Sequence, residues 1–215
     1  TVDMEEYIKT IRSAAQVVKQ KKRSSKDIKF SVDEWGVWAT PGNTVNEEID
    51  KEPWKIAPAI SEQIYTLEDA LLFAGMQMVI LRNADAIKIA CQSLLTNVSA
   101  CIMTEKNGGL WLQTIYYPFY YFANYARGVV LNAVAEGPCY DSEEYGNVSY
   151  VDNIVIWNDK NGELAVFAVN RDEKQKREVE VNVYEFELKK IIQSISMTAE
   201  DKKMTNQDNH QAVIP

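Results

Sequence analysis

The chain has 215 residues, and its 31 acidic side chains outnumber 23 lysines and arginines to give a formal net charge of −8. This balance argues against a nucleic-acid or anionic-membrane partner, because both select surfaces with clustered Lys and Arg, and no apolar run reaches the roughly 18 residues that would span a membrane. Three cysteines without a CxxC pair and a single histidine offer no convincing zinc site, disulfide scaffold or Ser-His-Asp site, so we expect no metal and no cofactor.

The first predicted element is an amphipathic helix over residues 4–20. Its apolar side chains recur at spacings of one, three and four residues, which places them on one helix face. They are Tyr7, Ile8, Ile11, Ala14, Ala15 and Val18. We expect this face to pack against a sheet, and we interpret the basic residues that follow as a solvated end that suits the helix dipole.

The next predicted element is a strand over residues 28–35, which ends in acidic and aromatic residues. Alternation assigns its residues to two faces, with Ile28, Phe30, Val32 and Glu34 on one and Ser31, Asp33 and Trp35 on the other. A carboxylate in line with apolar residues, followed at once by Trp35 and Trp38, indicates a sugar-binding surface at the mouth of a barrel. The simpler alternative is that Asp33 and Glu34 only end the strand and begin a loop.

Residues 40–61 are predicted to form a long loop. The breakers Pro41-Gly42-Asn43, Pro53 and Pro58 interrupt any regular element, whereas Trp54, Ile56 and Ile60 are apolar enough to need burial. Because long loops at the C-terminal ends of barrel strands build active-site walls, we expect this segment to form such a wall.

A helix capped by Thr66 is predicted next, with Glu68 and Asp69 in its first turn, where the dipole favours anions. Its apolar side is lined by Leu67, Ala70, Leu71, Ala74, Met78 and Leu81. A short strand over residues 86–90 follows, so helix, loop and buried strand succeed one another as in α/β folds. Residues 92–109 show no period, and Gly108-Gly109 is too isolated to cradle a phosphate, which excludes nucleotide binding.

Residues 113–125 are rich in aromatic side chains, which are Tyr116, Tyr117, Phe119, Tyr120, Tyr121, Phe122 and Tyr125. A nucleic-acid stacking platform would interleave such residues with basic ones, and only Arg127 lies near. We therefore predict a helix wedged between a barrel and a neighbouring domain.

From Gly128 onward the pattern becomes all-β. Turn-forming sequences separate four predicted strands, at residues 129–134, 148–157, 164–169 and 179–188. A change of parity near Tyr184 and Glu185 indicates a β-bulge. This succession is typical of a β-sandwich, and beyond one further strand over residues 191–197 we expect the polar tail, which holds His210, to be loosely held.

Six separated blocks share their order and spacing with one enzyme family. They lie at residues 30–38, 66–71, 87–90, 97–98, 102–105 and 113–119. On these blocks the chain, from residue 1 to about residue 170, resembles the C-terminal half of glycoside hydrolase family 51 α-L-arabinofuranosidases. The resemblance implies an α/β plus all-β fold, with the C-terminal part of a (β/α)8 TIM barrel over residues 1–127 and an incomplete β-sandwich over residues 128–215. A complete barrel takes about 250 residues by itself, so we expect a fragment of a longer enzyme.

The resemblance implies that Glu34, in the Asp-Glu-Trp block, is the catalytic nucleophile. Glu34 would attack carbon 1 of the sugar to form a covalent glycosyl-enzyme, while Trp38 would stack against the furanose or its neighbour. Alternation points Asp33 away from the barrel axis, so we expect it to bond backbone or a neighbouring strand. Retaining glycosidases need a second carboxylate about 5 to 5.5 Å from the first, and no block in residues 1–29 resembles the family's acid/base glutamate.

The chain departs from the family pattern at Gly36, Ala39, Leu94 and Cys101. Leu94 is the most damaging change because it stands where the family has a sugar-binding Gln, and losing a buried hydrogen bond to a sugar hydroxyl costs roughly 1 to 3 kcal/mol. Gln92, two residues earlier on the same strand parity, is a candidate to compensate.

Three functional interpretations remain. The first is the nucleophile half of a retaining α-L-arabinofuranosidase that acts on arabinose-containing oligosaccharides or polysaccharides and is inactive alone because its acid/base glutamate is missing. The second, favoured by Leu94, is a non-catalytic carbohydrate-binding or assembly fragment, and the third is an unrelated barrel enzyme that uses Glu34 as a base. The cysteine content fits reduced thiols in a cytoplasmic protein, and the resemblance implies a homo-oligomer for the full-length enzyme.

Overall fold

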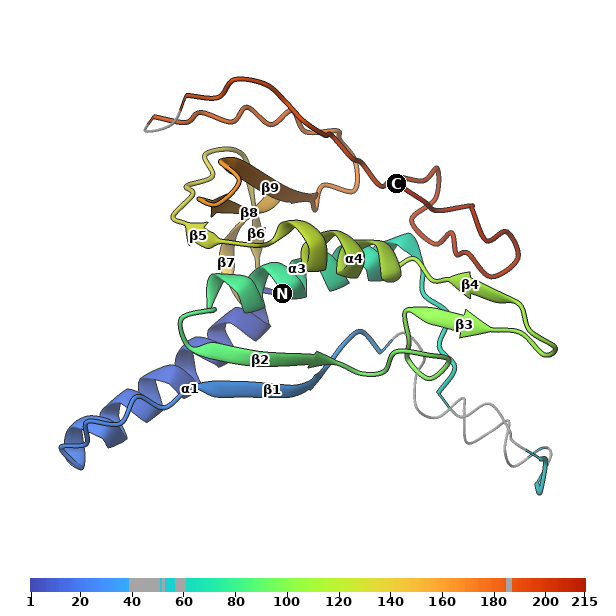
Figure 1. Ribbon diagram of the computed structural model, residues 1–215, viewed down its shortest axis with the longest axis horizontal. Coiled ribbons are helices and arrows are strands. Elements are labelled where there is room, and N and C mark those ends of the chain that lie inside the picture. Colours follow the sequence, from blue (N-terminus) through green and yellow to red (C-terminus); the bar gives the residue numbers. More distant parts are fainter. Residues whose placement is uncertain (39–50, 52, 57–60, 185–186) are drawn as a thin grey trace.

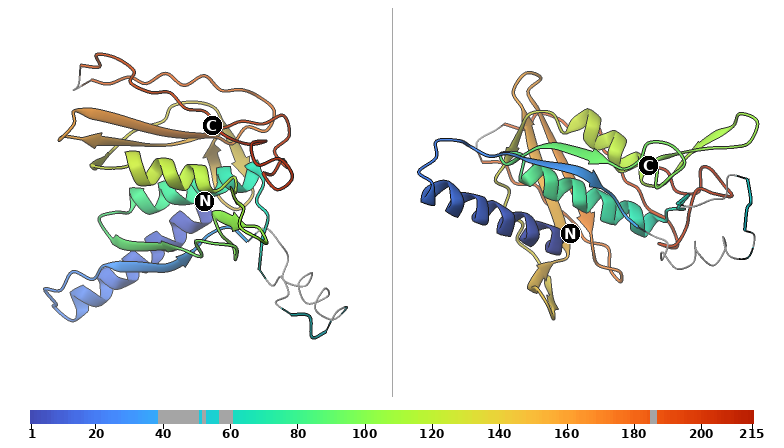
Figure 2. Two further views of the ribbon diagram at one scale, coloured as in Figure 1. Left: turned by 45° about the vertical axis from the view of Figure 1, so that its right-hand side comes forward. Right: turned by 90° about the horizontal axis from the view of Figure 1, so that it is seen from below.

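A computed structural model describes residues 1–38, 51, 53–56, 61–184 and 187–215 of the chain (Figure 1). In chain order its elements are α1 (Val2–Lys21), β1 (Phe30–Trp35), α3 (Leu67–Arg82), β2 (Ile87–Gln92), β3 (Ile102–Thr104), β4 (Leu110–Leu112), α4 (Tyr116–Tyr125), β5 (Val129–Leu131), β6 (Cys139–Ser142), β7 (Gly146–Ser149), β8 (Val151–Asn158) and β9 (Glu163–Asn170). Helices α3 and α4 lie between the β1–β2 pair and the sheet that contains β8 and β9, which gives a three-layer arrangement (Figure 2).

Helix α1 confirms the first predicted helix but not the packing expected of its apolar face. Asp3 and Glu5 lie in its first turn and lysines in its last, which suits the helix dipole. Ile8 is the one buried residue of the helix and joins a core cluster with residues of α3. Tyr7 and Val18 stay exposed. Most of the predicted face is therefore uncovered by the residues that the structure describes.

Helix α3 is the centre of the fold. The Thr66 hydroxyl accepts from the Asp69 backbone N–H at 3.2 Å and the Asp69 carboxylate accepts from the Thr66 backbone N–H at 2.8 Å, so the predicted N-terminal cap is present. One flank of the helix joins a cluster with Trp35 and Ile87, and the other joins a second cluster with Ile154. A helix that is apolar on several sides lies in the interior of a protein. The prediction that only one side of α3 is buried is therefore wrong, because two of its sides are buried.

Strands β1 and β2 form a parallel pair on either side of α3 in the sequence, which makes a single β-α-β unit. This unit confirms the α/β character predicted for the N-terminal half, but the described strands include no other parallel pair and no closed barrel. Parallel strands are normally buried on both faces, whereas Ile89 of β2 is 56% exposed. One face of the pair is therefore open.

A short hairpin joins β3, which lies in the stretch in which the sequence indicated no periodic element, to β4, which directly follows that stretch. Ile102, Met103 and Thr104 pair antiparallel with Leu112, Trp111 and Leu110. Strands of three residues are too short to show a readable alternation, which explains why the hairpin was not predicted.

The predicted all-β region is confirmed for β5, β8 and β9, which form a three-stranded antiparallel sheet. One face of this sheet packs against α3 and α4, and the rings of Phe122 and Phe167 stack with centroids 4.1 Å apart. Strands β6 and β7 pair separately. The sheet is thus covered by helices, and the described residues do not confirm a second facing sheet of the kind a sandwich requires.

The prediction of strands over residues 179–188 and 191–197 is wrong for the described residues of these two segments. Residues 179–184 and 187–197 run as extended chain with no assigned strand (Figure 1). The alternating valines need a partner strand to form a ladder, and Val179 and Val181 are exposed instead. The predicted bulge near Tyr184 and Glu185 lies partly outside the described residues.

The polar C-terminal tail is anchored, so the expectation that it is loosely held is wrong. Asn206 is fully buried, donates to the backbone carbonyls of Leu112 and Val213 at 3.1 and 3.0 Å, and accepts from the Val213 N–H at 2.8 Å. The His210 ring stacks on Trp111 with centroids 5.3 Å apart. A polar sequence can be buried in this way because its own side chains satisfy the backbone groups.

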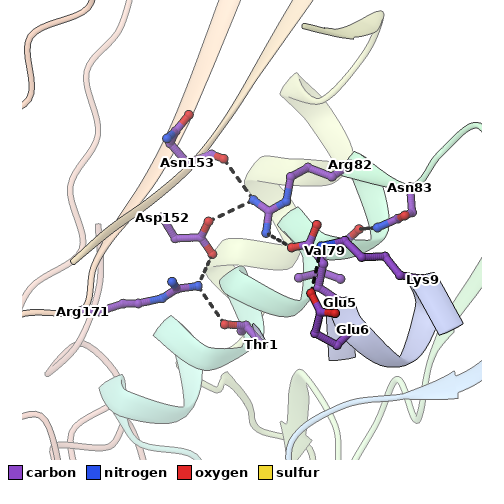
Figure 3. A network of polar contacts seen from close by, with 10 residues as sticks. All are labelled: Thr1, Glu5, Glu6, Lys9, Val79, Arg82, Asn83, Asp152, Asn153 and Arg171. Atoms are coloured by element: carbon purple, nitrogen blue, oxygen red, sulfur yellow. Dashed lines mark hydrogen bonds and ion pairs between the residues drawn. The ribbon is translucent and has the colours of Figure 1, made fainter. Parts of the chain in front are cut away.

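A polar cluster joins the helices to the sheet (Figure 3). Arg82, at the end of α3, donates to Asp152 of β8 at 2.9 Å and to Glu5 of α1 at 3.1 Å. Arg171, which follows β9, donates to the other oxygen of Asp152 and, at 2.8 Å, to Thr1. Because Asp152 is buried, its charge needs these two guanidinium partners. The cluster therefore fixes three parts of the chain that are distant in sequence.

Candidate active site

A β-bulge in β1 sets the direction of the Glu34 side chain. Val32 pairs with Ala90 and Trp35 pairs with Gln92, so two residues of β1 face one residue of β2 between these pairs. Such a bulge inserts one extra residue into the alternation, and bulges often re-aim side chains next to active sites.

This bulge overturns the predicted assignment of strand faces. Trp35 is buried, belongs to the same core cluster as Phe30 and Val32, and has its ring 4.7 Å from that of Phe73. Glu34 is exposed. The carboxylate is therefore not in line with the apolar residues of β1, because the extra residue places Trp35 rather than Glu34 against the packed helix layer.

The Glu34 carboxylate has a partner from the neighbouring strand. The Ser93 hydroxyl donates to Glu34 Oε1 at 2.7 Å. Ser93 directly follows β2, and its backbone N–H donates to the carbonyl of Trp35 at 3.1 Å. Since the C-terminal ends of parallel neighbours lie at the same edge, the two side chains meet there. Ser93 was not singled out from the sequence, although its place just after a predicted parallel strand was a usable signal.

Glu34 and Trp38 line one small hollow. The hollow has a volume of about 190 Å³, and its walls are Glu34, Trp35, Gly36, Val37, Trp38, Ser93 and Ser99. Trp38 is 64% exposed, so its ring is available to a ligand. Typical ligand pockets measure about 300 to 1,000 Å³, so the hollow formed by the described residues is smaller than a typical ligand pocket.

The loop predicted over residues 40–61 as an active-site wall lies largely outside the described residues. Within its described part, Trp54 and Ile56 are 98% and 95% exposed. The expectation that these two side chains are buried within the chain is therefore wrong. Ile60, for which burial was also expected, and Ala39, one of the departures from the family pattern, lie outside the described residues.

Asp33 is not part of the hollow. It is exposed and accepts a hydrogen bond from the Ser31 hydroxyl, two residues earlier on the same strand. The expected bond to backbone or to a neighbouring strand is therefore replaced by a local one. The two carboxylates thus have different partners: Glu34 accepts a hydrogen bond from the residue after β2, and Asp33 accepts one from its own strand.

A layer of polar contacts supports the floor of the hollow. The Gln92 side chain donates to the Ser99 carbonyl at 3.1 Å and accepts from the Cys101 thiol at 3.8 Å. The amide nitrogen and the amide oxygen of Gln92 are thus both engaged. Gln92 is therefore poorly placed to replace the sugar-binding glutamine that the family has at the position of Leu94. Leu94 itself is exposed.

Two buried titratable groups in this layer stay neutral near pH 7. Burial raises the pKa of Tyr65 to about 12, and its hydroxyl donates to the Val37 carbonyl at 2.9 Å. Burial likewise raises the pKa of the Cys101 thiol to about 12. Tyr65 thus supports the backbone of Val37 and Cys101 contacts the Gln92 side chain without adding a charge to the hollow, and Cys101 offers no thiolate nucleophile.

Glu34 is the one carboxylate among the described residues that line the hollow. A second carboxylate at catalytic distance is therefore not provided by the described walls of this site. Across the described ranges, no three His, Cys, Asp or Glu side chains gather in a way that would hold a metal ion. None of the helices in these ranges combines the length and apolar composition that a membrane crossing requires.

Comparison with known proteins gives a consistent result. The family model described as "Alpha-L-arabinofuranosidase C-terminal domain" matches residues 33–215. An intracellular exo-α-(1→5)-L-arabinofuranosidase of Halalkalibacterium halodurans is 41% identical over 211 residues, which cover 98% of this chain and 42% of that protein. The intracellular exo-α-(1→5)-L-arabinofuranosidase 1 of Bacillus subtilis is 40% identical over 217 residues, with coverage of 100% and 42%.

Solved structures agree with the sequence comparisons. A family 51 α-L-arabinofuranosidase from Bifidobacterium longum superposes with a TM-score of 0.79 at 30% identity and covers 99% of this chain and 42% of its own. The enzyme from Xanthomonas axonopodis pv. citri superposes with a TM-score of 0.67 at 19% identity, which is evidence for the fold alone. The chain therefore spans less than half the length of the relatives it matches.

Proposed function

The chain belongs to the α-L-arabinofuranosidase C-terminal domain family, within glycoside hydrolase family 51, and on this premise we propose that it supplies the nucleophile half of a retaining α-L-arabinofuranosidase. The observation that carries the proposal is the exposed Glu34 carboxylate at the end of a parallel strand, in one hollow with the exposed ring of Trp38. The family membership leaves no support for an unrelated enzyme that uses Glu34 to abstract a proton.

Glu34 attacks carbon 1 of a terminal arabinofuranosyl unit from the open side of the strand pair, and the leaving oxygen takes a proton from a second carboxyl group. Retaining enzymes keep these two groups about 5 to 5.5 Å apart. The described walls of the hollow hold one carboxylate, that of Glu34. Because no block in residues 1–29 resembles the family's acid/base glutamate, we propose that this second group comes from a part of the full-length enzyme outside this chain. The isolated chain is then inactive.

The open face of the β1–β2 pair supports the proposed architecture. A lone parallel pair with Ile89 exposed is stable only when further strands and helices cover it. We assign residues 1–127 to the last part of a (β/α)8 barrel, in which Glu34 lies at the C-terminal end of a strand, where barrel enzymes place their active sites. Residues 128–215 then form the accompanying β domain, with a sandwich as its complete form.

The names of the relatives suggest a substrate and a compartment. The proteins from Halalkalibacterium halodurans and Bacillus subtilis are named intracellular exo-α-(1→5)-L-arabinofuranosidases. We therefore propose that this protein acts in the cytoplasm on arabinose-containing oligosaccharides or polysaccharides. The family resemblance, and not these names, is the basis for also proposing a homo-oligomer. The aromatic surface of Trp38 suits the apolar face of a neutral sugar.

A non-catalytic carbohydrate-binding or assembly role is the second candidate. One observation favours it: Leu94 presents an exposed apolar side chain where a sugar-binding glutamine is expected, and Gln92 is already engaged with Ser99 and Cys101. In that case Trp38 binds sugar while Glu34 performs no chemistry.

Hydrolysis of 4-nitrophenyl α-L-arabinofuranoside by the full-length enzyme separates the two candidates. Glu34→Gln should lower kcat roughly a thousandfold or more, which corresponds to about 4 kcal/mol of transition-state stabilisation, whereas the matched variant Asp33→Asn should stay near wild type. Wild-type rates in Glu34→Gln would refute the catalytic proposal. The binding role would be established by two results together. The wild-type protein would show no turnover, and sugar binding would survive in Glu34→Gln but be lost in Trp38→Ala.

A further inference from the structure

We propose that Ser93 is a positioning residue that holds the Glu34 carboxylate in its attacking orientation. This inference rests on the proposed role of Glu34 as nucleophile and goes beyond it, because it assigns a function to a side chain on the neighbouring strand. The contact that carries it is the 2.7 Å hydrogen bond from Ser93 Oγ to Glu34 Oε1.

Glu34 needs an external restraint. The bulge frees its side chain from the alternation of β1 and leaves it exposed, so no apolar packing selects one rotamer. Within the described residues, the Ser93 hydroxyl is the one donor that reaches the carboxylate. Correct orientation of the reacting group is worth a large part of a catalytic rate, and losing the hydrogen bond from Ser93 would remove the one such restraint that the described residues provide.

The Ser93 hydroxyl is well placed for this task because the backbone on both sides of it is fixed. The Ser93 N–H donates to the Trp35 carbonyl at 3.1 Å, and the N–H of the next residue, Leu94, donates to the Ser99 carbonyl at 3.2 Å. Gln92, on the other side, donates its side-chain amide to the same Ser99 carbonyl at 3.1 Å. The hydroxyl is therefore presented from an anchored segment, as a preorganised site requires.

The geometry also divides the work between the two carboxylate oxygens. Oε1 accepts the Ser93 proton, and Oε2 has no hydrogen-bond donor among the described residues. A hydrogen bond to one oxygen fixes the plane of the carboxylate and leaves the other oxygen free for bond formation at carbon 1. Glu34, Ser93, Trp38 and Ser99 line the same hollow, so the hydrogen bond lies at the edge of the space in which the proposed sugar would bind.

The test compares Ser93→Ala and Ser93→Thr in the full-length enzyme. Removing the hydroxyl should lower kcat by about tenfold to a hundredfold, the loss expected for one hydrogen bond to a charged group, while KM changes by less than about threefold because substrate binding is untouched. Ser93→Thr keeps the hydroxyl and should recover most of the lost kcat. Ser31→Ala is the matched control, since Ser31 bonds Asp33 and not Glu34, and it should leave kcat unchanged.

The rate of covalent trapping by an activated arabinofuranosyl analogue provides a second measurement, since it reports attack by Glu34 alone. It should fall in Ser93→Ala in proportion to kcat. An unchanged trapping rate, or a loss that Ser93→Thr does not recover, would overturn the role of Ser93. Glu34→Gln distinguishes this failure from failure of the proposed function: if Glu34→Gln is inactive while Ser93→Ala equals wild type, only the positioning role is lost. If Glu34→Gln retains wild-type activity, both proposals fail.

Discussion

The interior around α3 and the open end of the β1–β2 pair are built on opposite rules. Around α3, Phe73 and Met78 are fully buried, and the carboxylate that enters this region, Asp152, is held by two arginines. At the end of β1, Glu34 and Trp38 are exposed, and Ser93 alone among the described residues bonds the carboxylate. The contacts that stabilise the chain and the groups proposed for its chemistry therefore lie in different places, so substitutions in the two regions should change different measured quantities.

The largest expected effect is in the interior. Phe73→Ala should lower the free energy of unfolding by about 3 to 5 kcal/mol, because it leaves a cavity between Trp35 and Phe119. Equilibrium urea unfolding measures the loss. Leu72→Ala on the same helix is the control, since Leu72 is half exposed and should cost less than about 1 kcal/mol. Equal losses in the two variants would break the contrast between buried and exposed positions.

The next largest effect tests the polar cluster that joins helices and sheet. Asp152→Ala should cost about 3 kcal/mol, because it leaves Arg82 and Arg171 partly buried without their shared partner. The control is Asp159→Ala in the turn after β8, which is exposed and should stay within about 0.5 kcal/mol of wild type in the same urea titration. A neutral Asp152→Ala would mean that apolar packing alone holds the layers together.

A smaller loss is expected where the tail docks. Asn206→Ala removes three hydrogen bonds to buried backbone groups and should cost about 2 kcal/mol. Hydrogen exchange should show faster exchange at residues 202–213 with little change in α3. Gln207→Ala, at the exposed neighbour, should leave both quantities unchanged, and slow exchange in Asn206→Ala would show that other contacts hold the tail.

The ion pair between Glu68 of α3 and Lys203 of the tail should make the free energy of unfolding depend only slightly on pH. Hydrogen bonding to Lys203 lowers the pKa of Glu68 in the folded state, so the pair stabilises the fold above the unfolded pKa, about 4.3, and this stability is lost as pH falls through the folded pKa. An exposed pair contributes at most about 1 kcal/mol. Wild type and Glu68→Gln should therefore differ in unfolding free energy at pH 7 and converge in acid. A difference that persists in acid would contradict this assignment.

The smallest effect on stability belongs to the site. Trp38→Ala should change the unfolding free energy by no more than about 0.5 kcal/mol, because the ring is largely exposed. The same variant of the full-length enzyme should bind arabinose-containing oligosaccharides more weakly, as isothermal titration would show. A large loss of stability in Trp38→Ala would mean that the ring is structural and would remove the distinction between the two regions.

Much of the fold could be predicted because its signals are local. The apolar spacing of α1, the Thr66 and Asp69 cap of α3 and the alternation of β8 and β9 each lie within a few residues of one another in sequence. Residues 179–188 carry a similar alternation and yet form no strand where they are described, because a ladder also needs a partner. Burial of the tail through Asn206 was likewise unpredictable, since its partners Leu112 and Val213 are chosen by tertiary contacts.

The candidate site divides in the same way. Glu34 and Trp38 were identified from their sequence block, and the structure places both in one hollow. Strict alternation could not predict the directions of these side chains, because the bulge in β1 forms only when β1 pairs with β2. Ser93 was missed for the same reason, as it reaches Glu34 from 59 residues away.

The helix-strand order of the N-terminal half and the change to β structure after Gly128 could be predicted from the amino-acid sequence, because short-range periodicity is a property of neighbouring residues. The role of Glu34 as candidate nucleophile came from the resemblance of its sequence block to one enzyme family. The bulge in β1, the burial of Trp35 in place of Glu34 and the hydrogen bond from Ser93 to the carboxylate became visible only in the folded chain. These features depend on strand pairing and packing between distant segments, and no local pattern encodes which segments will meet.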